Sequence, residues 1–96
     1  MRKSNTEPIG GIIREYLKAI DIDNKLNEVR LIDSWPDVVG KEVAKKTAKL
    51  LVKNRVLFVY LNSSIVRAEL LRIREALPEA LNRKAGAKVI DDIVFR

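Results

Sequence analysis

Residues 55–77 have the sequence R-V-L-F-V-Y-L-N-S-S-I-V-R-A-E-L-L-R-I-R-E-A-L, and this stretch decides the fold because a strand pattern is followed by a helix pattern. The apolar run 56–61 is made of β-branched, aromatic and aliphatic side chains, which favours a mostly buried strand. The polar residues 62–64 that follow can accept hydrogen bonds from the free N–H groups of a first helical turn. The expected helix places Val66, Leu70, Ile73 and Leu77 on one face.

The composition indicates an ordinary globular protein: 47% of the 96 residues are hydrophobic and 33% are charged. We expect a single domain over residues 1–96, with residues 1–5 flexible. The chain has no cysteine and no histidine, which excludes disulfides, thiolate or imidazole metal sites, and Cys–His or Ser–His catalysis. We therefore expect no cofactor and no metal. No apolar run approaches the roughly 18 residues of a membrane span, so a cytoplasmic location is the default expectation.

The first third of the chain shows the pattern of three helices. Apolar residues at helical spacing predict an amphipathic helix over 9–20, and the segment from Asp21 to Asn24 is expected to form a turn after it. A second helix should bury Leu26, Val29 and Ile32. Pro36 should end that helix and open a third one. Gly40 inside the third helix suggests a tight contact with a neighbouring element.

The remaining chain predicts three strands and one interrupted helix. Strands are expected at 48–52, 56–61 and 89–95, with Asn54 adopting a left-handed conformation in the turn between the first two. The helix from residue 64 should break near Leu77 because of Pro78, and Gly86 should cap its end. The first two strands form an antiparallel hairpin, and the right-handed crossover helix makes the third strand parallel to the second. The predicted fold is α+β, a small three-stranded mixed sheet with helices on one face.

Positive charge is concentrated between residues 41 and 55. This window holds six basic residues and one acid, Glu42, so it carries +5 of the chain's net charge of +6. A clustered excess of this kind favours a polyanion partner. The basic residues, which we take as candidate nucleic-acid contacts, are Lys41, Lys45, Lys46, Lys49, Lys53 and Arg55. The alternative is a solvated helix face in which Glu42 and Lys46 form an i,i+4 pair.

Alternation along strand 56–61 separates two faces. Leu57, Val59 and Leu61 should point toward the helices, and Phe58 and Tyr60 should point outward. The lysines at positions 49 and 53 then share the outer face with these aromatic rings, where bases could stack while lysines hold the phosphates. The alternative is that the first helix or a second subunit covers this face, because exposed apolar patches most often mark protein contacts.

Other conspicuous residues have structural interpretations. Trp35, the sole tryptophan, is expected to be a buried anchor between helices. Arg67 and Arg74 are expected to be solvated. Asp91 and Asp92 are neighbours and should point to opposite sides of a strand, so they cannot act as a catalytic pair. No spacing matches a phosphate loop, a metal cage or a nucleophile elbow, so we expect no enzyme.

Three segments together resemble the DciA family of bacterial proteins: 34–47 (S-W-P-D-V-V-G-K-E-V-A-K-K-T), 56–70 (V-L-F-V-Y-L-N-S-S-I-V-R-A-E-L) and 89–96 (V-I-D-D-I-V-F-R). The resemblance covers about residues 26–96. It implies a K-homology-like fold and a role in loading or assisting the replicative DNA helicase, with single-stranded or forked DNA nearby. Ile65 stands where the family often has tryptophan, and the long basic extension of many members is not found after Arg96. The chain has no Gly-x-x-Gly loop, so K-homology clamping of RNA is not expected.

Two functional hypotheses from different classes follow. The first is a non-enzymatic nucleic-acid- and helicase-associated module in DNA replication. The second is a protein–protein adaptor or a homodimer that uses the outer sheet face and binds no nucleic acid. Salt-dependent binding to single-stranded DNA separates the two.

Overall fold

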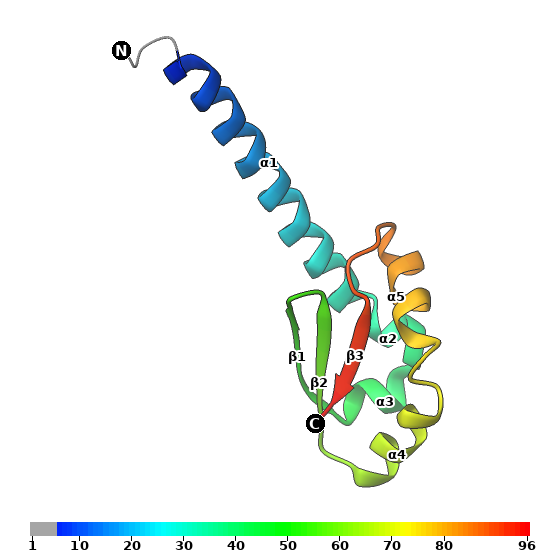
Figure 1. Cartoon of the computed structure of the whole chain (residues 1–96). Helices are drawn as coiled ribbons and strands as arrows, with labels where there is room; N and C mark the ends of the chain where they lie inside the picture. The colour runs from blue at the N-terminus through cyan, green and yellow to red at the C-terminus, as the bar shows by residue number, and fades with distance from the viewer. Residues whose placement is uncertain (1–5) are drawn as a thin grey trace.

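The computed structural model describes residues 6–96, with side chains from residue 13 onward, and shows an α+β fold (Figure 1). The helices and strands follow in the order α1 (Thr6–Asp33), α2 (Trp35–Val39), α3 (Lys41–Lys45), β1 (Thr47–Lys53), β2 (Val56–Leu61), α4 (Ser64–Arg72), α5 (Leu77–Ala85) and β3 (Asp92–Phe95). The sheet order is β1-β2-β3, antiparallel between β1 and β2 and parallel between β2 and β3. The predicted three-stranded mixed sheet with helices on one face is confirmed. The expectation that residues 1–5 are flexible lies outside the described residues.

The β1–β2 hairpin turns through Asn54 and Arg55, whose backbone φ angles are 53° and 63°. A two-residue hairpin loop of this kind needs the left-handed conformation at both positions, because that conformation matches the twist of the strands. The prediction for Asn54 is confirmed, and Arg55 adopts the same conformation without having been predicted to. The resulting register pairs Leu51 with Phe58, so these two side chains share one face of the sheet.

The other face of the sheet packs against the helices and forms one side of the core. On β2, Leu57 and Val59 are fully buried and Leu61 is nearly so, as the alternation predicts. Ile93 on β3 pairs with Leu57 and is also fully buried. Residues from the helices and from the segment before β3 complete the core: Leu31, Trp35, Leu70, Leu77, Leu81, Ala85, Val89 and Ile90.

Trp35 is the largest of the fully buried side chains, which confirms its predicted role as an anchor. Its indole Nε1 donates a hydrogen bond of 3.0 Å to Thr47 Oγ1, and that hydroxyl donates to the Val43 carbonyl at 2.9 Å. The polar tip of a buried tryptophan needs such a partner. This relay fixes the first residue of β1 to the last turn of α3.

α1 is one continuous helix of 28 residues, so the predicted turn at 21–24 is wrong. The segment lacks glycine and proline, and carrying the helix through Asp or Asn costs less than about 0.7 kcal/mol per residue relative to Ala. An ion pair of 3.5 Å between Asp21 and Lys25 also bridges one turn there. The predicted buried face is wrong as well, because Leu26 and Val29 are about half exposed and Leu31 is fully buried instead.

The molecule measures 63 × 22 × 21 Å along its principal axes because α1 extends well beyond the other elements (Figure 1). Only the C-terminal end of α1 packs against α2, α5 and β1, and residues 13–26 are all exposed. The helix does not lie over the outer sheet face, so that part of the alternative interpretation is wrong.

The third predicted helix is divided at Gly40 into α2 and α3. Pro36 lies in the first turn of α2, as predicted. Gly40 has a φ of 94°, and a Cβ built on it would meet no atom within 4 Å. The expected tight contact at Gly40 is therefore wrong, and the glycine is needed for its positive φ, which other residues rarely adopt.

α4 and α5 are separated by a turn at residues 73–76, so the expected break before Pro78 is confirmed. The Ser63 hydroxyl caps α4 by accepting a hydrogen bond of 3.2 Å from the backbone N–H three residues later. Ile73 was predicted to be buried, but it follows the last residue of α4 and is 49% exposed. Gly86 ends α5 in a left-handed conformation, φ 84°, as predicted.

β3 is shorter than predicted because a side chain binds the backbone that precedes it. Asn82 Oδ1 accepts hydrogen bonds from the N–H groups of Val89 and Ile90 at 2.9 and 3.0 Å. Its Nδ2 donates to the Ile90 carbonyl at 2.8 Å. These backbone groups are therefore bound to α5 and do not extend the ladder with β2.

Arg74 is exposed, as predicted, and Arg67 is partly buried, but both also donate hydrogen bonds to backbone carbonyls in or next to β3. Arg67 donates to the carbonyl of Arg96 at 3.2 Å. Arg74 donates to the carbonyl of Ile93 at 3.0 Å and forms an ion pair of 3.2 Å with Asp92. Together these contacts hold the edge strand β3 to the α4 side of the molecule.

Candidate nucleic-acid interface

The outer sheet face combines apolar and basic side chains. The β1–β2 register sets Lys49 beside Tyr60 and Leu51 beside Phe58. Val94 on β3 pairs with Phe58 from the other side. Leu51 is exposed and the two aromatic rings are half-buried. The structure therefore brings both predicted stacking residues onto the same face as a predicted basic residue.

Each aromatic ring on this face has a cation over it. Lys49 Nζ lies 5.5 Å from the ring centroid of Tyr60, and Arg96 Cζ lies 5.4 Å from that of Phe58. Cation–π contacts at exposed sites contribute about 0.5–1 kcal/mol. Base stacking on an aromatic side chain contributes about 1–3 kcal/mol. The two cation–π contacts are therefore weaker than a stacked base would be.

Arg96 is a residue of this face that the sequence analysis missed. The alternation of β3 gave the signal, because Val94 and position 96 lie on the same side of the strand. The Arg96 backbone is also ordered by pairing: its N–H donates to the carbonyl of Val59 at 2.8 Å, and its carbonyl accepts from the N–H of Leu61 at 2.9 Å.

The predicted basic residues fall into two groups and one separate residue. Lys49 and Lys53 lie on the outer face of β1, about 13 Å apart along the strand. Lys41 and Lys45 belong to α3, and Lys46 follows it directly before β1. The second group is therefore at the end of the sheet opposite the hairpin turn, on the side where α3 packs. All five lysines are exposed.

The α3 lysines are not engaged in strong ion pairs. Glu42 pairs with Lys45 at 3.9 Å, in place of the Glu42–Lys46 pair considered from the sequence. Both side chains are more than 70% exposed, so the pair contributes little to stability. Lys45 and Lys46 therefore remain available to an anion.

Arg55 is separate because it binds Asp91. Its Nε and Nη2 donate hydrogen bonds of 2.8 and 3.0 Å to the two carboxylate oxygens. The hydrogen bonds from Arg55 lower the pKa of Asp91 below its ordinary value, and the positive charges of Arg55 and Lys88 lower it further. The Arg55 carbonyl also accepts the Asp91 N–H at 2.8 Å. Arg55 thus fixes the hairpin tip to the chain before β3, and Asp91 neutralises its charge.

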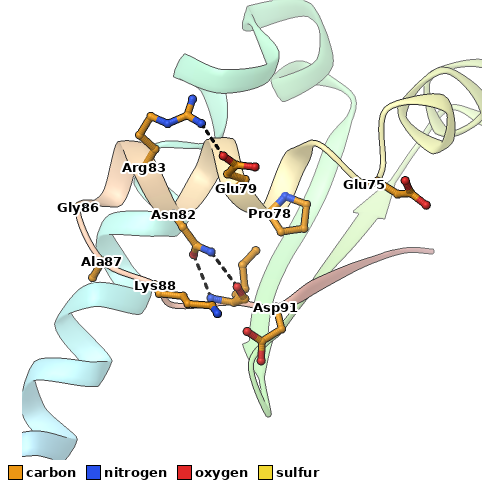
Figure 2. Close-up of a pocket in the computed structure, with 10 residues that line it drawn as sticks. Glu75, Pro78, Glu79, Asn82, Arg83, Gly86, Ala87, Lys88 and Asp91 are labelled. Carbon is orange, nitrogen blue, oxygen red and sulfur yellow. Dashed lines mark hydrogen bonds and ion pairs between the residues drawn. The ribbon is translucent and has the colours of Figure 1, made fainter.

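A surface cavity with a volume of about 640 Å³ lies between α5 and the segment 86–91 (Figure 2). Asn82 stands at its centre with its amide bound to backbone groups, as described above. Glu79 and Arg83 form an ion pair of 3.0 Å at its rim. Three of the polar side chains that line the cavity, Asn82, Glu79 and Arg83, are thus engaged in hydrogen bonds or an ion pair. Among the residues described, no group of three or more His, Cys, Asp or Glu side chains could hold a metal ion.

These features define a small α+β domain with a partly basic, partly aromatic sheet face. The family model described as "Dna[CI] antecedent, DciA" matches residues 8–95, nearly the whole chain. The chain belongs to the DciA family, as its sequence segments indicated, and this membership supports a role in DNA replication.

Neither the search of curated proteins nor the search of solved structures found a match. The K-homology likeness of the fold therefore stays a prediction. No helix in the described part of the chain is both long enough and apolar enough to span a membrane.

Proposed function

We propose that this protein is a non-enzymatic module of the helicase-loading machinery that works in the cytoplasm beside the replicative DNA helicase. Family membership supports the association with the helicase. We further propose that the module binds single-stranded or forked DNA through its outer sheet face. The observation that carries this proposal is the placement of Lys49 and Lys53 on the same face as Phe58 and Tyr60.

The proposed division of roles follows from the chemistry of each group. Lys49 and Lys53, continued by the lysines at 41, 45 and 46, contact phosphates and so carry no base information. Phe58 and Tyr60 stack with bases, which is tolerant of sequence because every base has an aromatic face. Arg55 is left out of this set because its guanidinium is bound to Asp91.

Fluorescence anisotropy with a labelled oligo-dT strand across a salt series tests the DNA-binding proposal. The logarithm of affinity should fall linearly with the logarithm of salt, by roughly 0.7 per contacted phosphate. Lys49→Glu with Lys53→Glu should weaken binding and flatten the slope. The matched control is Lys18→Glu with Lys84→Glu, which changes the net charge equally but lies on α1 and α5. Equal weakening by both pairs would indicate a general charge effect and contradict the assigned face.

A protein partner on the outer face is the second candidate function. The observation that favours it is the exposed apolar area of that face, where Leu51 is 39% exposed next to half-buried Phe58 and Val94. A protein adaptor or a sheet-to-sheet homodimer would cover these side chains. A pull-down from the native host read for the replicative helicase, repeated with Leu51→Glu, measures this function independently of DNA.

A further inference from the structure

The exposed part of α1 carries an apolar stripe formed by Ile13, Tyr16, Leu17 and Ile20. These side chains are 54%, 67%, 59% and 39% exposed. Their spacing of i, i+3, i+4 and i+7 places them on one face of the helix. Apolar side chains clustered in this way mark an interaction surface more often than scattered ones do.

The stripe lies in a stretch of α1 that no other described element covers. Residues 13–26 are all exposed, and Asn27 and Glu28 are partly buried. Two copies of α1 that cross antiparallel at the stripe have their sheets at opposite ends of the pair.

We propose that the α1 stripe pairs antiparallel with the same stripe of a second copy of this chain. A two-fold interface requires a surface that is complementary to itself. In the antiparallel register Ile13 lies opposite Ile20 of the second copy, and Tyr16 lies opposite Leu17 of the second copy. Each side chain of the stripe therefore lies opposite an apolar side chain of the second copy.

The charges beside the stripe fit this pairing. Arg14 and Asp21 lie on the same side of the stripe, seven residues or about 10.5 Å apart along the helix, too far to pair within one chain. A two-fold axis brings the same side of both helices together, and it sets Arg14 within two residues of Asp21 of the second copy. Residues 13–33 carry four basic and five acidic side chains, whereas the whole chain has a net charge of +6. The balance of charge on α1 argues against a polyanion partner there.

The size of the stripe predicts a reversible dimer. Pairing removes roughly 800–1,000 Å² of surface from water across both copies, which is near the lower limit for a specific interface. The molecule should therefore change from monomer to dimer as its concentration rises. The monomer should be folded without its partner.

Sedimentation equilibrium of the full chain from low to high micromolar concentration tests the pairing. The mass should rise from 10.9 kDa toward twice that value. Leu17→Glu should weaken dimerisation about tenfold or more, because it places an unpaired charge in the interface. The matched control is Leu26→Glu, at a similarly exposed leucine nine residues later and therefore on the opposite side of the helix. Fluorescence of buried Trp35 reports that each variant is folded.

A charge exchange tests the orientation. Arg14→Asp and Asp21→Arg should each weaken the dimer, and the double variant should restore it. A wild-type chain that stays monomeric at every concentration would overturn the proposal. So would a dimer disrupted by Leu26→Glu and untouched by Leu17→Glu, or a double variant as weak as the single ones. DNA binding by Leu17→Glu should stay at the wild-type level, so failure of this proposal is distinct from failure of the proposed function.

Discussion

The two faces of the sheet come from the same residues of the same strands, and they have opposite surroundings. On β2, Leu57 and Val59 are fully buried beneath the helices, while Phe58 and Tyr60 alternate with them and remain partly exposed. The inner face is apolar and packed, with Phe95 as an aromatic ring among aliphatic side chains. The outer face is mixed, with lysines, aromatic rings and one exposed leucine. Core packing explains the apolar composition of the inner face. The mixed composition of the outer face is not required for folding, so it calls for a functional explanation.

The difference in packing between the two faces can be tested by truncating one leucine on each face. Leu57→Ala should lower the free energy of unfolding by roughly 2–5 kcal/mol, because it leaves a cavity in the core. Leu51→Ala removes the same atoms from a side chain that is 39% exposed and should cost less than half as much. Chemical denaturation of both variants provides the measurement. Equal losses would show that the outer face is packed as tightly as the inner one.

Asn82 on α5 binds the backbone of the segment before β3, and the contribution of these hydrogen bonds to stability can be measured separately. Asn82→Ala leaves the backbone N–H groups of residues 89 and 90 without their partner and should cost roughly 1–3 kcal/mol. Asn82→Asp keeps the acceptor oxygens and should lose less. Denaturant midpoints compare the two variants. An alanine variant as stable as the wild type would contradict the assigned role of this side chain.

Substitutions on the outer face should change the affinity for single-stranded DNA more than they change the stability of the fold. Phe58→Ala should weaken binding to single-stranded DNA by roughly 1–3 kcal/mol if a base stacks on the ring, with little change in the salt slope. Its matched control is Val94→Ala, which trims the cross-strand neighbour of Phe58 and leaves the aromatic ring in place. Anisotropy gives both affinities. If the two substitutions weaken binding equally, the aromatic ring contributes no more to DNA binding than its aliphatic neighbour does.

The smallest expected effect concerns the ion pair that holds the hairpin tip. Asp91 has a lowered pKa in the folded protein, so its contribution to stability is present above the ordinary carboxyl pKa of about 3.9. That contribution is lost as the pH falls through the pKa of the folded state. Wild type should therefore melt above Asp91→Asn at neutral pH, and the difference should disappear in acid. A difference that persists unchanged into strong acid would disprove the pairing as its cause.

The sequence predicted the parts of the fold that depend on local pattern. The alternation of 56–61, the turn at Asn54 and the caps at Ser63 and Gly86 each have a local physical cause, and the structure has all of them. The turn predicted at 21–24 failed because polar residues without glycine or proline only weakly oppose a helix.

The partners of Arg55 and Arg74 depend on contacts distant in sequence and could not be predicted. Arg55 binds Asp91, 36 residues away, and Arg74 binds the backbone of Ile93, 19 residues away. No pattern within a helix or strand specifies such distances. For the candidate site, the alternation placed Lys49, Phe58 and Tyr60 on one face, and the same rule applied to β3 would have added Arg96. The alternation could not show that Arg55 is bound to Asp91.

A chemical-shift titration of the ¹⁵N-labelled chain with oligo-dT tests the central claim most directly. The account predicts that amide shifts concentrate on the outer-face residues of β1 and β2 and on the lysine segment from α3 into β1. Residues of α5 and of the exposed half of α1 should stay unchanged, and they serve as the internal control. Shifts confined to α1 or α5, or no shifts at low salt, would contradict the assignment of the outer sheet face as the nucleic-acid interface.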